Sequence, residues 1–251
     1  MRTLLIAMLF GAFGALRLPI ESTLTRHEHA LHLEEAPLNL NLRQQIGQLP
    51  FLGALTGFRS VVADGAFIQA QVAWQQTQWA RVLLCLREAT TLQPRSILFW
   101  EMAAWHMGWN ASLAALQDPS LPNDTLRRRA EREYFDLGKD FLEQGIRSNP
   151  RIPQLHEALA RLYREKYRDH AAAARCYAEA ASLPGGPEYD RRFAAYELSH
   201  VPGREREAYR QLRGLYDRGE EERLPTLLRR LKYLEEKLDI PLQERIPATE
   251  M

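Results

Sequence analysis

Prolines recur at the ends of helix-like stretches between residues 94 and 184, and their spacing limits the folds that this chain can adopt. Pro94, Pro150 and Pro184 each follow a stretch with helical apolar periodicity, and the last two are 34 residues apart. The interval of 56 residues from Pro94 to Pro150 equals the same 34 residues plus an insertion of 22. Because proline lacks an amide donor and clashes with the preceding turn, each one marks the end of a helix. A return at this fixed interval is typical of a repeat protein built from pairs of helices.

Similar residue types recur within these stretches at the same interval. In the first helix of a unit, a ring-bearing residue is followed by small or apolar residues at fixed spacing. The two clearest sets are Trp100, Ala103, Ala104 and Met107, and then His156, Leu159, Ala160 and Tyr163. The second helix of a unit places small residues before its proline, as in Gly138-x3-Leu142-x2-Gly145-x4-Pro150. These positions resemble the motifs of the tetratricopeptide repeat (TPR) family, with His156 in place of the family's Trp.

The resemblance implies an all-α fold, namely an α-α superhelix or solenoid of antiparallel helix pairs. We expect this TPR-like domain to span residues 51–238, with about four repeats and the 22-residue insertion between the helices of the second. Two helices can cross closely only where small side chains separate their backbones. The small residues expected at these crossings are Ala70, Ala104, Ala160 and Ala195 in the first helices and Gly138 in a second helix.

The first twenty residues differ in character from the rest of the chain. Met1–Thr3 is a short basic start, and the thirteen residues Leu4–Leu16 carry no charge. This length suits the core of a signal peptide, whereas an extension past Arg17 to Ile20 would allow a membrane anchor. A buried first helix of the domain is the alternative, which the lack of a polar face disfavours.

The predicted organisation places the repeats outside the cytoplasm. Residues 1–20 are expected to be a signal peptide or membrane anchor, residues 21–50 a linker and residues 239–251 a C-terminal tail. Because Arg2 favours a cytoplasmic start, we expect a single-pass N-terminal anchor in the cell membrane with extracytoplasmic repeats, or an exported protein after signal cleavage. The stretch FLGALTGFR at 51–59 resembles the lead-in of an uncharacterised group of bacterial membrane-tethered TPR proteins, which implies no activity.

The charge balance argues against a nucleic-acid-binding protein. The formal net charge is +1, whereas a nucleic-acid partner usually requires a strongly basic surface. Arginine greatly outnumbers lysine, but the arginines alternate with glutamates along the predicted helices. We therefore interpret the arginine content as a coding bias and expect no nucleic-acid partner.

Few residue patterns point to catalysis. The chain has no Gly-rich phosphate loop, no G-x-S-x-G motif and no CxxC pair, and no cofactor is expected. A cluster of three imidazoles, His27, His29 and His32, supplies the alternative hypothesis of an envelope metal-binding protein or enzyme. Cys85 and Cys176 lie two repeats apart, beyond the reach of a disulfide, and are expected to be small core residues. The sequence favours a protein that is not an enzyme.

Tryptophan is concentrated in one part of the chain, since all five lie between residues 74 and 109. In the TPR family the first helices line a concave groove that binds peptides. Transferring that register to this chain gives the predicted partner-binding residues Phe67, Trp74, Trp105, Arg161, Arg164, Arg192 and Tyr196. Such a groove, aromatic at one end and basic at the other, suits a protein or peptide with apolar anchors and an acidic stretch or carboxylate. The alternative is that the tryptophans pack under the insertion.

Two further elements complete the prediction. The insertion should form a loop at 117–123, with Asp124 or Thr125 capping the long helix that follows. Near the C-terminus, leucines recur at intervals of three and four, at Leu224, Leu227, Leu231, Leu234 and Leu238. A terminal helix that caps the repeats fits this stripe, and a short dimeric coiled coil is the alternative, so the oligomeric state stays open.

Overall fold

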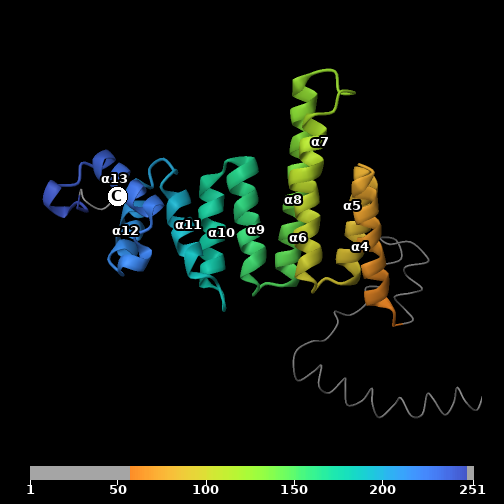
Figure 1. Cartoon of the computed structure of the whole chain (residues 1–251), viewed down its shortest axis with the longest axis horizontal. Coiled ribbons are helices and arrows are strands. Elements are labelled where there is room, and N and C mark those ends of the chain that lie inside the picture. The colour runs from red at the N-terminus through yellow and green to blue at the C-terminus, as the bar shows by residue number, and fades with distance from the viewer. Residues whose placement is uncertain (1–56, 248–251) are drawn as a thin grey trace, which may run out of the picture. The chain divides into compact units, whose positions relative to one another are not determined.

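A computed structural model describes residues 57–247, and every element of regular structure in this range is a helix (Figure 1). The all-α prediction is confirmed for this part of the chain. The α-helices are α4 (Arg59–Gln75), α5 (Trp79–Leu92), α6 (Ile97–Trp105), α7 (Ser112–Leu116), α8 (Asp124–Ser148), α9 (Pro153–Leu162), α10 (His170–Ser182), α11 (Glu188–Leu198), α12 (Glu205–Tyr216) and α13 (Pro225–Lys237). Two π-helical segments, η1 (His106–Ala111) and η2 (Tyr163–Tyr167), and two 3-10 turns, η3 (Glu220–Glu222) and η4 (Leu242–Glu244), complete the set.

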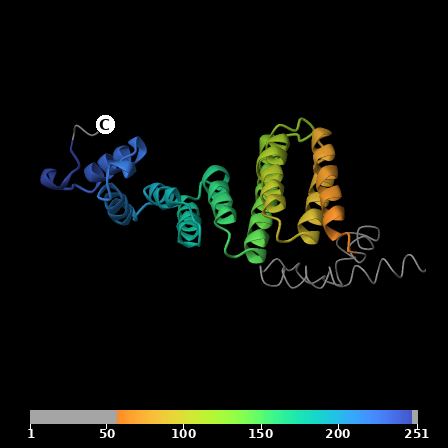
Figure 2. The same cartoon turned by 60° about the horizontal axis from the view of Figure 1, so that its bottom comes forward.

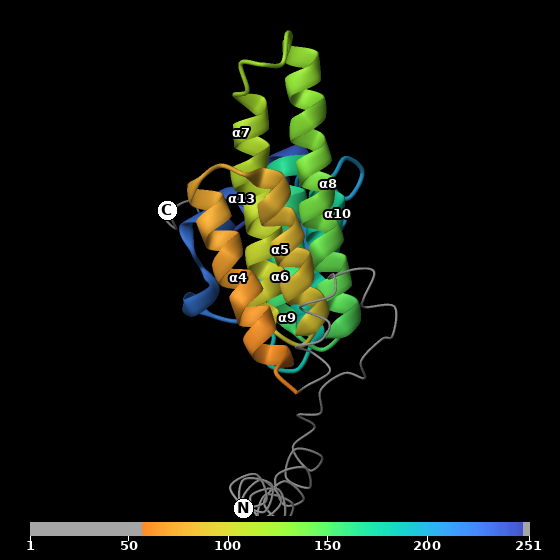
Figure 3. The same cartoon turned by 90° about the vertical axis from the view of Figure 1, so that its right-hand side faces the viewer.

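Helices that are neighbours in the chain are also neighbours in space (Figures 1 and 2). The segment α6–η1–α7 is nearly continuous and pairs with α8, and α9–η2 pairs with α10 in the same way. Each pair packs in turn on the next, as α8 does on α9 and α10 does on α11. The residues of the insertion lengthen α7 and the first part of α8, which extend past the other helices in the end view (Figure 3).

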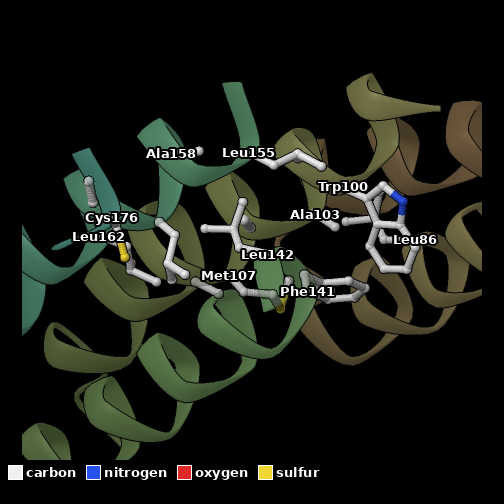
Figure 4. Close-up of a cluster of buried hydrophobic side chains, with 14 of the residues drawn as sticks. Leu86, Trp100, Ala103, Met107, Phe141, Leu142, Leu155, Ala158, Leu162 and Cys176 are labelled. Carbon is white, nitrogen blue, oxygen red and sulfur yellow. The ribbon is translucent and has the colours of Figure 1, made fainter. Parts of the chain in front are cut away.

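The hydrophobic core contains the repeated motif residues (Figure 4). The Trp100 ring packs on Phe141 of α8, and its indole Nε1 donates a hydrogen bond of 2.8 Å to the Pro94 carbonyl. Asn149 donates through Nδ2 to the same carbonyl at 2.8 Å. The loop after α5 is thereby tied both to the first helix of the next pair and to the loop that follows its second helix.

The ends of the helices have local causes. The helices α5, α8 and α10 end two residues before Pro94, Pro150 and Pro184, as the proline positions predict. At the start of α8 the prediction of Asp124 or Thr125 as the cap was wrong. Asn123 is the N-cap, and its side-chain oxygen accepts a hydrogen bond from the Leu126 amide at 2.9 Å because its extended backbone points that oxygen at the helix start.

The predicted crossings are tight. The four alanines expected at crossings in the first helices are buried. At Gly138 of α8, an added Cβ would lie 3.1 Å from the Ala104 carbonyl oxygen and 3.1 Å from the Gly108 amide nitrogen. Gly138 therefore lies where α8 touches the backbone at the α6–η1 junction, and a side chain there has no free space.

The C-terminal leucine stripe packs against other helices of the same chain. Leu227, Leu231 and Leu234 are fully buried in a second hydrophobic cluster that α13 forms with α11 and α12. The carboxylate of Glu235 accepts a hydrogen bond from the Ile246 amide at 2.9 Å, which fastens the following segment to α13. This arrangement agrees with a capping helix, because the stripe packs against the preceding helices.

Several predictions concern residues 1–56, which lie outside the described residues. They are the signal peptide or anchor at 1–20, the linker at 21–50 and the cluster of His27, His29 and His32. Among residues 57–247, no helix combines the length and the apolar character needed to cross a membrane.

Candidate functional site

Two π-helical turns lie in the first helices of two successive pairs, where η1 separates α6 from α7 and η2 ends the helix that begins as α9. The turn η1 begins two residues after Ala104, and η2 begins three residues after Ala160, so each follows a helix crossing. A π-turn inserts one residue into the helix and thereby rotates the side chains that follow it; such turns are common at functional sites. Gly108 lets the two segments approach, since an added Cβ there would lie 2.9 Å from Cδ1 of Leu162.

Side chains from the two turns contact one another. The indole Nε1 of Trp109 donates a hydrogen bond of 3.2 Å to the Glu165 carboxylate. The ammonium group of Lys166 lies 5.3 Å from the centre of the Trp109 ring, within range of a cation–π interaction. Trp105 stacks on Trp109 with ring centres 5.0 Å apart and ring planes 16° apart, so the pair presents one broad aromatic surface.

This aromatic pair lines a pocket of about 560 Å³, hereafter the aromatic pocket. Its lining residues come from α6, η1, α8, α9 and η2, and they are Glu101, Met102, Ala104, Trp105, Trp109, Leu142, Ala158, Arg161 and Glu165. Trp105 is 48% exposed, which is high for the largest apolar side chain. The pocket has the size and the mixture of apolar and convergent polar groups that ligand sites have.

Charges of both signs surround the aromatic pocket. Burial raises the pKa of Glu101 above its ordinary value, and the Arg161 guanidinium partly opposes that effect. Burial acts in the same direction on Glu165, but hydrogen bonds from Arg164 and Trp109, together with the positive charges of Arg164 and Arg161, outweigh it and hold the pKa of Glu165 below its ordinary value. The nearest contact is that of Arg164 Nη2 with Glu165, at 2.7 Å. The lining itself carries two carboxylates and one guanidinium, and Arg164 at its edge adds a second positive charge, whereas the sequence predicted a basic surface here.

The structure places two of the seven predicted partner-binding residues, Trp105 and Arg161, in the lining of one pocket. Arg164 reaches its edge through Glu165. Trp74, partly exposed, packs edge-on against His106, with ring centres 5.2 Å apart.

The other three predicted residues are engaged elsewhere. Phe67 stacks on Phe99 with ring centres 5.0 Å apart and packs against the core. Arg192 forms an ion pair of 2.7 Å with Glu222, and both side chains are largely buried. The hydroxyl of Tyr196 is buried without a hydrogen-bond partner in the described part of the chain. None of these three lines the aromatic pocket.

Three pocket residues with functional groups were not among the seven predicted ones, namely Glu101, Trp109 and Glu165. Their spacing carries a signal, because each stands four residues before or after a predicted site residue, Trp105 or Arg161, and such pairs share a helical face. The π-turns that bring Trp109 and Glu165 together left no recognisable signal in the sequence.

A buried carboxylate lies further along the same first-helix surface. Asp190, in the first turn of α11, is 0% exposed, and neither of its oxygens has a hydrogen-bond partner within residues 57–247. Burial, reinforced by the negative charge of Glu157 and opposed by Arg161, raises the pKa of Asp190 from 3.8 to about 7. The adjacent Tyr189 donates to Glu157 at 3.1 Å.

The described residues present little machinery for catalysis. No group of three or more His, Cys, Asp and Glu side chains is arranged there to hold a metal ion. Cys85 and Cys176 are buried free thiols, as expected, and burial raises the pKa of Cys176 to about 12, which disfavours the reactive thiolate.

Comparisons of the chain with protein-family models, with curated proteins and with solved structures find no match. Function is therefore inferred from the residues of this chain.

Proposed function

We propose that this protein is a non-enzymatic interaction scaffold with a TPR-like solenoid of helix pairs, and that its aromatic pocket binds a segment of a partner protein. The observation that carries the proposal is the stacked pair Trp105 and Trp109 in a pocket with charged groups at its edge, where the Trp105 ring stays open to solvent while Trp109 packs partly against the core. Exposing so much aromatic surface is unfavourable in water, and tryptophan and arginine are enriched among the residues that dominate binding energy.

The TPR-like part of the proposal rests on the sequence motifs and on the pairing of helices. Trp100 and Ala104 are buried, and Gly138 lies against the backbone of the α6–η1 junction, which supports this part of the proposal. The helix pairs follow one another along the chain, and Pro94, Pro150 and Pro184 come after the second helices of the first three pairs.

The mixed charges around the aromatic pocket change the expected ligand. An apolar side chain of the partner would cover the Trp105 face, while flanking groups of either sign would pair with Arg161 or Glu101. We therefore expect a peptide with an aromatic or aliphatic anchor beside charged residues, rather than a purely acidic peptide.

A displayed library of random 12-residue peptides, selected on the purified protein, tests this proposal. Replacing Trp105 with alanine and Arg161 with glutamate should each weaken the selected peptides roughly tenfold or more, with unchanged melting temperature. The Arg161 variant should also reduce the salt dependence of binding, because the Arg161 contribution is Coulombic and screened. The Trp105 variant should leave the salt dependence unchanged, because its contribution is apolar burial.

Matched controls are available elsewhere on the chain. Tyr233 is also 48% exposed and lies on α13, and Arg128 is an exposed arginine on α8. Tyr233→Ala and Arg128→Glu should leave peptide binding unchanged. Equal losses in test and control variants, or full binding by both test variants, would show that the aromatic pocket is not the peptide-binding site.

We further propose that the scaffold is exported or tethered at the cell envelope through residues 1–20. The apolar stretch Leu4–Leu16 behind a basic start supports this location. Full-length protein should fractionate with membranes or the envelope, and a chain that starts at Glu21 should be soluble. Recovery of the full-length protein in the soluble cytoplasmic fraction would contradict the proposal.

A further inference from the structure

A second groove runs between α10 and α12, along α11. It consists of two adjoining cavities of about 420 and 200 Å³ that share Ala178, Ala194 and Gln211 in their linings. The helix α11 packs on both α10 and α12 and provides the floor through Ala194 and Leu198. We call this feature the arginine groove.

The lower part of the arginine groove is apolar. Along α10 the apolar lining residues are Ala171, Ala174, Ala178 and Ala181, which recur at intervals of three and four and so form one stripe. The stripe spans eleven residues, or about 15 Å at 1.5 Å per residue, which is close to three helical turns. Ala174 is buried, whereas Ala178 is exposed and Ala171 and Ala181 are half-buried, so an elongated ligand would meet the exposed parts of this stripe.

The rim of the groove is strongly basic. Five arginines line it, namely Arg175, Arg191, Arg204, Arg210 and Arg218, against one carboxylate, Glu207. Glu188, just outside the lining, pairs with Arg191 at 3.3 Å and Arg218 at 3.6 Å, and Arg204 donates to Glu207 at 2.6 Å. The whole chain carries only +1, so this is a local concentration of positive charge.

A comparable gap within the chain lacks this character. The cavity between α5 and α8 has only two charged residues in its lining, one arginine, Arg87, and one aspartate, Asp140. The excess of arginine in the α10–α12 gap is thus not found in the α5–α8 gap, which also lies between two second helices.

Gly214 lines the arginine groove on the side formed by α12. It lies within α12, where glycine costs about 0.5–1 kcal/mol relative to alanine. A Cβ at this position would meet nothing within 4 Å, so no contact of the described chain requires glycine. A ligand helix lying close to α12 would require it, because the missing side chain lets two backbones approach.

We propose that the arginine groove binds an acidic amphipathic helix of a partner protein. The small or apolar face of that helix lies on the α10 alanines, and its glutamates or aspartates pair with the arginines on both walls. Arginine presents a planar fork that binds carboxylates through two hydrogen bonds. The arginines are divided between the two cavities along the groove, which matches a ligand with charges along its length and not a single phosphate.

The test uses a displayed library of 16-residue peptides in a helical register, selected on the full chain. Enriched peptides should carry Asp or Glu beside a face of alanine or leucine. Gly214→Leu fills the groove without an internal clash and should weaken these peptides at least tenfold, as should Arg210→Glu. The matched control is Gly65→Leu in α4, where an added Cβ also meets nothing within 4 Å, and it should leave binding unchanged.

Two further measurements distinguish the arginine groove from the aromatic pocket and from a lipid-binding surface. Trp105→Ala should leave the acidic helices bound, so failure of the aromatic pocket and failure of the arginine groove are distinguishable. Vesicles of anionic phospholipid, added to the same variants, test a lipid surface as the occupant. The proposal is overturned if no acidic helix is enriched, if Gly214→Leu binds as the wild type does, or if anionic vesicles bind through Arg210 in place of peptides.

Discussion

Replacing Gly138 with leucine is expected to lower the free energy of unfolding by about 3 kcal/mol. The added Cβ alone lies 3.1 Å from the Ala104 oxygen and from the Gly108 nitrogen. These are backbone atoms of the α6–η1 junction, and they cannot rotate away as the end of a side chain can. For a domain of this size, the change corresponds to a melting temperature lower by roughly 6–12 °C, measurable by circular dichroism.

The control for Gly138 is the same substitution in open space. Gly65→Leu in α4 should leave the melting temperature unchanged or raise it slightly, because leucine is the better helix former and nothing lies within 4 Å. If the two variants melt at the same temperature, the close crossing at Gly138 is not present in solution.

Replacing Asp190 with asparagine should stabilise the protein at pH 8 by roughly 2–4 kcal/mol. The ionised Asp190 carboxylate is buried without a hydrogen-bond partner in the described part of the chain, and it faces the like charge of Glu157. Moving its pKa from 3.8 to about 7 corresponds to at most roughly 4 kcal/mol at about 1.4 kcal/mol per pH unit. Asparagine has a similar shape and carries no charge.

The sign of the pH dependence follows from the direction of that shift. Because the folded pKa is raised, the folded state holds the Asp190 proton between about pH 4 and pH 7 whereas the unfolded state has released it. The Asp190 contribution to stability is therefore fully retained below about pH 4 and declines as the pH rises to about 7. Urea unfolding at pH 5 and pH 8 should show a larger gain for Asp190→Asn at pH 8. A gain that does not change with pH would show that Asp190 is not the titrating group.

Sequence patterns were most informative where local chemistry decides the structure. Pro94 and Pro150 end helices by the same steric conflict wherever they occur, so their positions predicted helix ends. Gly138 was recognised because only a small residue fits where two helices cross, and the contacts around it agree. The predicted cap of α8 missed the observed one, Asn123, because adjacent Asn, Asp and Thr are all good capping residues and the sequence alone does not choose among them.

The parts of the site that were missed depend on contacts between distant residues. The pairing of Arg192 with Glu222 removes that arginine from the predicted surface, and the two residues are thirty positions apart. The contact of Trp109 with Glu165 joins residues 56 positions apart and depends on two π-turns, which have no simple periodic signal. The burial of Asp190 is likewise set by the packing of α11 against its neighbours and not by its own sequence context.

Site-specific photo-crosslinking tests the aromatic pocket most directly. Met102 lines the pocket without being one of the residues proposed to bind, so p-benzoylphenylalanine at this position leaves Trp105 and Arg161 in place. In cells that produce the full-length protein, irradiation should yield a covalent adduct with a partner protein, and Arg161→Glu in the same chain should abolish that adduct. An adduct that persists with Arg161→Glu, or that forms equally with the crosslinker at Tyr233, would contradict the claim that this pocket is where the protein binds its partner.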